Sequence, residues 1–184
     1  MQAADPHVIS ANGKFYMYAT NANSNGDCSY LQVWSSENLT NRTNEGICYQ
    51  PSRTNWCIDG LWAPEVIERN GTFYLYYSGW SLQNKIHEIG IAKSTSPTGP
   101  FKEFVGLNDN GDMISEKEAP IHINIDGGKV DAVIDASPFI DKDGKAYLYF
   151  VQDQHNIPSK GAYVSTIYVA ELNNDMVSIK EDTI

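Results

Sequence analysis

Two aspartates in this sequence stand where carboxylates can do acid/base chemistry. Asp5 precedes one proline by a single residue, Asp135 precedes another by three, and each proline belongs to an apolar run that predicts a β-strand. Two carboxylates that converge on one hollow push their pKa values apart, as acid/base chemistry requires. The alternative for each is an aspartate that only caps a turn before proline. Both are therefore candidate catalytic residues, provided that the fold brings them together.

A hairpin unit occurs three times along the chain. Each copy has an apolar strand with a proline, a tight Asn-Gly or Asp-Gly turn, and an alternating aromatic strand. With the prolines aligned, the copies cover residues 5–18, 63–77 and 137–150, and further β-rich runs follow at 31–35, 89–93 and 166–170. Convincing helical periodicity appears nowhere. The pattern predicts repeated antiparallel sheets.

Sheets that repeat at this spacing are typical of propeller blades around a central channel. We predict an all-β fold, an incomplete β-propeller with blades at about residues 1–50, 51–110 and 130–184 in one domain. A β-sandwich is the alternative, but it does not explain why proline and the turn return at matching places. A propeller normally has at least four blades, so three leave bare edges that predict self-association or pairing with a complementary chain.

The composition argues against several kinds of partner. The net charge of -10 would repel a phosphate backbone, and the 13 Lys and Arg form no run that could neutralise neighbouring phosphates. No nucleic-acid partner is therefore expected. No stretch approaches the roughly 20 apolar residues of a membrane helix, so no membrane span is expected.

Secretion is predicted from cysteines and glycosylation sequons. One disulfide plus one free thiol would suit a secreted protein with these cysteines: Cys28, Cys48 and Cys57. Sequons permit glycosylation in a eukaryotic secretory pathway at Asn38, Asn41 and Asn70. A signal peptide is absent from this sequence, so we expect the natural start to lie upstream of Met1.

Several motifs together resemble glycoside hydrolase family 43. These are Ala-Asp-Pro-His-Val-Ile at 4–9, Leu-Trp-Ala-Pro-Glu-Val at 61–66, Ile-Asp-Ala-Ser-Pro-Phe-Ile-Asp at 134–141, and the run 96–101. They span nearly the whole chain in the order of the family, and no single motif would suffice. The resemblance implies the N-terminal part of a five-bladed propeller that hydrolyses glycosidic bonds.

The resemblance also implies roles for the two aspartates. Asp5 matches the general base that activates water, and Asp135 matches the residue that orients the general acid and modulates its pKa. The acid itself is usually a glutamate that introduces a Glu-Gly-Pro motif, which this sequence lacks. We therefore expect inverting hydrolysis in the complete site and little or no activity of this chain alone.

Four further residues are candidates for substrate binding. Trp62, Glu65, His7 and Trp80 border the site by resemblance or by position, and aromatic faces suit the apolar faces of sugars. Packing between blades is the alternative for Trp62, and a buried structural hydrogen bond is the alternative for Glu65.

No metal site is predicted from the histidines, and no cofactor is required. Their spacing would not place two on one strand face: His7, His87, His122 and His155. The resemblance allows a calcium or other ion in the axial channel, without residues of this chain to hold it.

The leading hypothesis is a hydrolase of arabinose- or xylose-containing plant polysaccharides, such as an α-L-arabinofuranosidase, β-xylosidase or arabinanase. The partner expected is an arabinan- or xylan-type oligosaccharide. Two alternatives remain at this point: a carbohydrate-binding module that keeps the pocket without the acid, and an association module whose open blades dock a second chain.

Overall fold

The computed structural model describes residues 2–22, 28–121, 123–125, 127–157 and 161–184, and almost all of its regular structure is β-strand. Blade 1 contains β1 (Gln2–Ala11), β2 (Lys14–Ala22), β3 (Leu31–Ser36) and β4 (Thr43–Tyr49), each antiparallel to the next. Blade 2 contains β5 (Trp62–Arg69), β6 (Thr72–Trp80), β7 (His87–Ser94) and the short β8 (Lys102–Glu103). Blade 3 contains β11 (Lys129–Ile140), β12 (Ala146–Ile157) and β13 (Gly161–Leu172).

Two short strands and a helical turn complete the fold. β9 (Gly106–Leu107) pairs with β10 (Met113–Ile114) in the connection between blades 2 and 3, and a 3-10 turn, η1, covers Glu181–Thr183. Among the described residues, no helix has the length and apolarity that crossing a membrane would demand.

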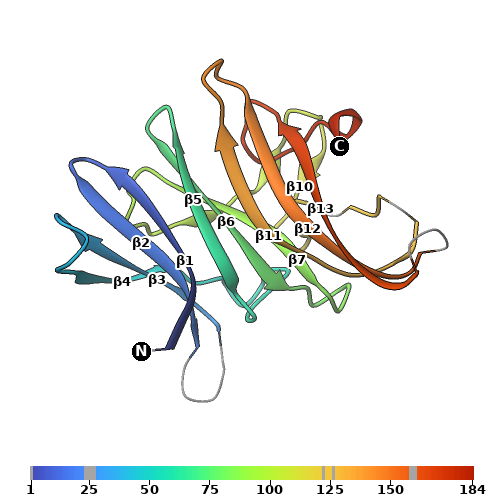
Figure 1. Cartoon of the computed structure of the whole chain (residues 1–184), viewed down its shortest axis with the longest axis horizontal. Coiled ribbons are helices and arrows are strands. Elements are labelled where there is room, and N and C mark those ends of the chain that lie inside the picture. The colour runs from blue at the N-terminus through green and yellow to red at the C-terminus, as the bar shows by residue number, and fades with distance from the viewer. Residues whose placement is uncertain (1, 23–27, 122, 126, 158–160) are drawn as a thin grey trace.

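The three blades stand side by side, and their first strands are neighbours. β1 packs beside β5, and β5 packs beside β11, so one strand of each blade lies on the same side of the molecule (Figure 1). A single parallel bridge between His87 and Ala132 joins blades 2 and 3 into one continuous sheet. Within the described residues the blades do not close into a ring. The prediction of an all-β, incomplete propeller is confirmed.

The hairpins follow from their turn residues. Asn12-Gly13 and Asn70-Gly71 have positive φ at both positions, as two-residue type I′ hairpins require. The third hairpin differs, because Ile140 pairs with Ala146 and leaves a five-residue loop over 141–145. The first two strands of blade 3 are therefore joined by a longer turn than the first two strands of blades 1 and 2.

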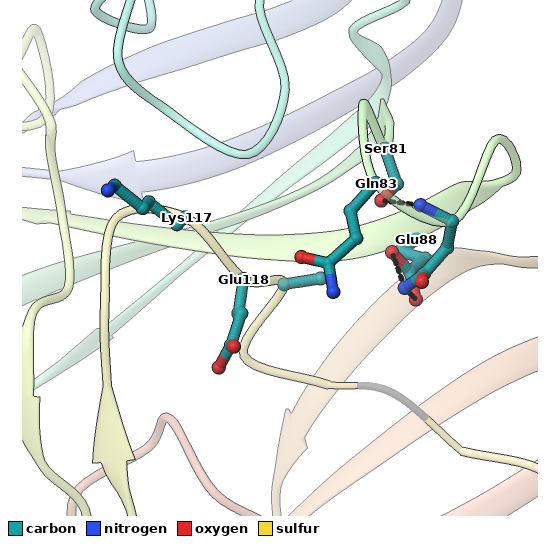
Figure 2. A pocket seen from close by; sticks show the side chains of 7 residues that line it. Ser81, Gln83, Glu88, Lys117 and Glu118 are labelled. Carbon is teal, nitrogen blue, oxygen red and sulfur yellow. Dashed lines mark hydrogen bonds between the residues drawn. The ribbon is translucent and has the colours of Figure 1, made fainter.

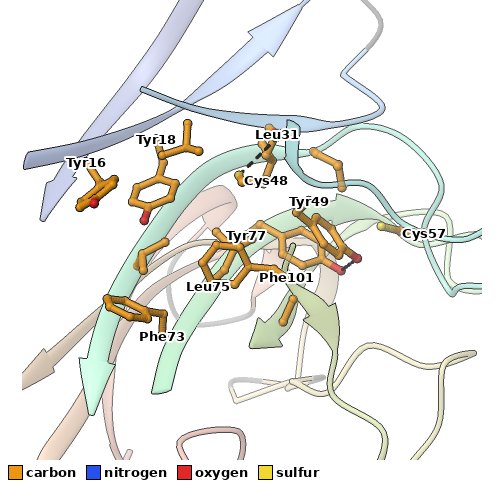
Figure 3. Packing of buried hydrophobic residues seen from close by; sticks show 14 of the residues in the cluster. Tyr16, Tyr18, Leu31, Cys48, Tyr49, Cys57, Phe73, Leu75, Tyr77 and Phe101 are labelled. Carbon is orange, nitrogen blue, oxygen red and sulfur yellow. Dashed lines mark hydrogen bonds between the residues drawn. The ribbon is translucent and has the colours of Figure 1, made fainter. Parts of the chain in front are cut away.

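Two hydrophobic cores lie between the blades. The core between blades 1 and 2 gathers aromatic side chains such as Tyr18, Phe73 and Tyr77 (Figure 3). The core between blades 2 and 3 contains Tyr76 and Phe150, so β6 contributes to both. Full burial of a large apolar side chain stabilises the folded state by about 1.5–3 kcal/mol, and the blades are held together chiefly by these contacts.

A buried carboxylate fastens blade 1 to blade 2. Glu103 accepts hydrogen bonds from Tyr77 Oη at 2.6 Å, Tyr49 Oη at 2.8 Å and Trp56 Nε1 at 2.8 Å. Burial raises the pKa of Glu103, and these three hydrogen bonds act against that rise. Three donors from different parts of the chain therefore converge on one acceptor.

The cysteines do not form the disulfide expected for a secreted form. All three side chains are buried, and Cys48 and Cys57 are free thiols. Burial raises the pKa of Cys48 to about 12, which keeps its thiol protonated and unreactive at neutral pH. These side chains act as small apolar groups in the interior.

Candidate functional site

Each first strand carries a β-bulge at the same place in its blade. The register shifts fall between Ala4 and His7, between Trp62 and Glu65, and between Ile134 and Ser137. In each bulge one residue other than glycine has positive φ: Asp5 at 50°, Ala63 at 44° and Asp135 at 56°. Such backbone conformations are uncommon for these residue types and cluster at functional sites. Asp5 and Asp135 therefore occupy equivalent positions in blades 1 and 3, with Ala63 in blade 2.

This register corrects the alignment of the third repeat on its proline. Pro6 and Pro64 directly follow the bulge residue, whereas Ala136 does so in β11 and Pro138 lies two residues further along. The aspartates also lie within β1 and β11, not at the entrances of these strands. The feature that repeats is the bulge, and the proline in blade 3 belongs to a different register position.

Hydroxyl groups of one blade hold the bulge of the next. Thr20 Oγ1 donates to Asp5 Oδ2 at 2.7 Å and accepts the Ala63 N–H at 2.8 Å. Ser78 Oγ accepts the Asp135 N–H at 3.1 Å. Thr20 and Ser78 have matching places on the second strands, opposite the residue before the bulge. The sequence analysis missed both, although a hydroxyl residue at the same place in two repeats was a signal.

The electrostatics link the two aspartates. Partial burial raises the pKa of the Asp135 carboxyl, and the negative charges of Asp5 and Asp153 raise it further. As whole residues, Asp5 and Asp135 both remain exposed. The two carboxyls are thus near enough to interact while still open to solvent, an arrangement that can activate water and tune a neighbouring acid.

An aromatic group lies on blade 2, whose first strand packs between the strands that carry the two aspartates. The Trp62 ring stacks on His87 with ring centroids 3.6 Å apart, and Trp80 meets the same histidine edge-on at 5.1 Å. Trp62 is 39% exposed and Trp80 is 36% exposed, so both keep ring surface for a ligand. Burial lowers the pKa of His87, which favours the neutral ring between the two indoles. The sequence analysis considered His87 only as a metal ligand and missed this support.

His7 and Glu65 meet at the boundary between blades 1 and 2. His7 Nε2–H donates to the Val66 carbonyl at 2.9 Å, and His7 Nδ1 lies 3.6 Å from Glu65 Oε2. Both side chains are partly exposed. His7 Nε2 is thus engaged in a contact between blades. The neighbouring Glu65 carboxylate, which is partly exposed, is the polar group here that a ligand could reach.

A polar cavity of about 260 Å³ opens at the turn between β6 and β7 (Figure 2). Its lining includes Gln83, Lys117 and Glu118 at the rim and the buried Glu88, both of whose oxygens accept from Asn84 Nδ2 at 3.0 Å. Glu88 follows His87 in β7, so their side chains point to opposite faces of the strand. None of the residues predicted from sequence lines it.

Metal ligands do not gather in the part of the chain that the structure describes. There, no group of three or more His, Cys, Asp or Glu side chains is arranged to hold a metal ion. His122 lies outside the described residues. The axial ion that the resemblance allows therefore has no ligand set among these residues.

An open β-propeller with paired carboxyls on its first strands is the class of protein that these features define. The family model "Glycosyl hydrolases family 43" matches residues 1–184. A xylosidase/arabinosidase 43A from Humicola insolens is 30% identical over an alignment of 160 residues, with 80% of this chain and 42% of that protein covered. The extracellular endo-α-(1→5)-L-arabinanase 2 of Bacillus subtilis is 27% identical, with 92% of this chain and 34% of that protein covered.

Solved structures agree with these sequence matches. The crystal structure of a thermostable family-43 glycoside hydrolase superposes with a TM-score of 0.76 at 31% identity, covering 98% of this chain and 51% of that one. The chain belongs to glycosyl hydrolase family 43, and its blades are of the five-bladed type. It spans between a third and a half of the length of the two curated relatives above.

Proposed function

We propose that this chain forms the N-terminal blades of an inverting glycoside hydrolase that cleaves arabinose- or xylose-containing plant polysaccharides. Asp5 is the general base that takes a proton from water, and Asp135 orients the general acid and modulates its pKa. The observation that carries the proposal is the equivalence of the two bulges, whose carboxyls interact by charge.

The substrate class is supported by the relatives and by the aromatic group. The similar proteins named above are a xylosidase/arabinosidase and an arabinanase, both named for pentose-containing substrates. Trp62 and Trp80 offer exposed ring surface to the apolar face of a sugar, and Glu65 offers a hydrogen-bond acceptor at the boundary between blades 1 and 2. A polymeric substrate outside the cell suits a secreted enzyme, and the Bacillus subtilis relative is named extracellular.

The general acid is proposed to come from a further blade that these 184 residues do not include. No Glu-Gly-Pro motif is present, and the only glutamates after Asp135 are Glu171 and Glu181. Glu171 forms ion pairs with Lys180 and Lys145, and the hydrogen bond from Lys180 is the main cause that lowers its pKa. A carboxylate held in this way is a poor proton donor, so Glu171 is unsuited to the role.

Sugar binding and turnover test the proposal separately. We expect xylotriose or arabinotriose to shift the indole NMR signals of Trp62 and Trp80, with weaker binding in Trp62→Ala. Hydrolysis of nitrophenyl pentosides should stay near background, since loss of general-acid assistance costs about 10²–10⁴ in rate. Turnover by the purified chain that Asp5→Ala abolishes would contradict the placement of the acid. Absence of any pentose binding would contradict the substrate class.

A longer form of the protein separates the hydrolase from a binding module. If it carries a glutamate before Gly-Pro in a fourth blade, it should cleave the oligosaccharide, and Asp5→Asn should remove turnover while binding persists. A longer form that binds sugar and never cuts it would favour the binding module.

A further inference from the structure

Blade 2 has a second cavity at the end of its strands away from Trp62 and Trp80. The cavity is about 500 Å³, and Thr72, Ser94 and Lys102 line it. Thr72 begins β6 and Trp80 ends it, so eight residue steps separate the two ends, a distance on the order of 26 Å. This cavity is therefore remote from the candidate hydrolase site.

Two lysines face one another across adjacent strands in this cavity. Tyr74 pairs with Lys93 and Lys93 pairs with Lys102, so the three side chains form one row on the same face of β6, β7 and β8. Like charges directly opposite each other are destabilising. The lining contains no carboxylate, although the whole chain has a net charge of -10. A cationic hollow in an acidic chain favours an anionic occupant.

Neither lysine is neutralised by its surroundings. Within the described residues, Lys93 and Lys102 form no ion pair, and Lys93 Nζ lies 4.8 Å from the centre of the Phe104 ring. Arg69 adds positive charge near Tyr74, and the nearby acid is Asp175. The Asp175 carboxylate is already occupied, because it accepts the backbone N–H groups of residues 109, 177 and 178.

The rest of the lining is suited to a sugar. Thr72, Ser94 and Thr95 contribute hydroxyl groups, and Tyr74 contributes an aromatic ring. Ser94 Oγ accepts the Ser96 N–H, which leaves its own proton free to donate. Cavities of about 300–1,000 Å³ hold small-molecule ligands, so a single sugar ring has room here.

We propose that this cavity binds an anionic sugar, a six-carbon sugar acid whose carboxylate meets Lys93 and Lys102. Its hydroxyls would pair with Thr72, Ser94 and Thr95, and its ring would lie against Tyr74. Such a site recognises an acidic unit at a place on the surface far from the bond to be cleaved. It goes beyond the proposed hydrolase function and does not depend on it.

Titration of the 184-residue chain with glucuronate, acetate and xylose tests the site, with NMR signals of Tyr74 and the neighbouring backbone as the readout. Glucuronate should bind more tightly than acetate, added salt should weaken it, and xylose should leave these signals unmoved. Lys93→Gln and Lys102→Gln should each weaken glucuronate binding about tenfold. Lys142→Gln, in the exposed loop between β11 and β12, is the matched control and should change nothing.

The outcomes are distinct. Equal binding of acetate and glucuronate would overturn the sugar specificity, and glucuronate binding that both lysine variants retain would place the site elsewhere. Absence of glucuronate binding would overturn the proposal outright. Asp5→Asn should leave glucuronate binding intact, so failure here and failure of the hydrolase proposal can be told apart.

Discussion

The carboxyl of Asp135 has a raised pKa for which burial is the main cause, followed by the charges of Asp5 and Asp153. Asp5→Asn removes one of those charges while keeping the shape of the side chain. We expect the pKa of Asp135 to fall, which a pH titration of its carboxyl carbon by NMR will measure. Asp182→Asn, on the exposed 3-10 turn, is the control and should have no effect.

The same shift has a consequence for stability. Because the folded state raises the pKa of Asp135 above its unfolded value, folding favours the protonated carboxyl. The contribution of this group to stability is therefore present at low pH and is lost as pH rises through the folded-state pKa. Asp5→Asn should lower the folded-state pKa of Asp135 and so shrink the pH range over which this contribution to stability is lost. If the pKa of Asp135 stays unchanged in Asp5→Asn, the two carboxyls are too far apart to interact by charge.

At this scale the sequence identified the residues that carry motifs and missed those that depend on packing. Asp5 and Asp135 stand in motifs that the family shares, so their places in the chain were evident. Thr20 and His87 gain their contacts only in the fold: Thr20 meets the Ala63 N–H of the next blade, and His87 meets the Trp62 ring from another strand of its own blade. The repeated hydroxyl was a signal for Thr20, whereas the local sequence around His87 gives no sign of its stacking.

At the scale of elements, one acceptor gathers three hydrogen bonds at the joint between blades 1 and 2. Glu103→Ala would remove the acceptor of three buried donors, Tyr49 Oη, Tyr77 Oη and Trp56 Nε1. One tyrosine hydroxyl can still donate to the other across 2.8 Å, so two donors are left unsatisfied. Each unsatisfied buried donor costs about 1–3 kcal/mol, so we expect a loss of about 2 kcal/mol or more in the free energy of unfolding. Urea denaturation will measure it.

Two further variants calibrate this loss. Glu103→Gln keeps one oxygen acceptor but turns an NH₂ group toward donors, so it should lie between the wild type and Glu103→Ala. Glu118→Ala, an exposed change at the rim of the polar cavity, should stay within about 0.5 kcal/mol of the wild type. A Glu103→Ala variant as stable as Glu118→Ala would show that the donors find other partners.

The hairpins were predictable from sequence, whereas their register was predictable only in part. Asn12-Gly13 and Asn70-Gly71 determine two-residue turns, and the strands around them have the predicted order. In blade 3 the five-residue loop at 141–145 breaks the match, so aligning Pro138 with Pro64 placed Asp135 out of step with Asp5. Bulge positions depend on pairing between strands, which the order of residues alone does not specify.

At the scale of the whole molecule, blade 3 has one covered face and one open face. Leu148, Phe150 and Ala170 pack against blade 2. The opposite face exposes apolar side chains that alternate with them along the strands, namely Phe139, Tyr149, Ile167 and Val169. In a propeller this face would meet a further blade, and here it meets solvent.

We expect the 184-residue chain to self-associate through this open face, because exposed contiguous apolar surface and an unpaired edge strand both favour contact between copies. Light scattering coupled to gel filtration should give a mass that rises with concentration. Ile167 is 74% exposed at the edge strand β13, so Ile167→Lys should shift the chain toward monomer without loss of stability. Ile184→Lys, also exposed but outside the sheet, should not. A compact monomer at every concentration would mean that the open face is too weakly apolar to drive association.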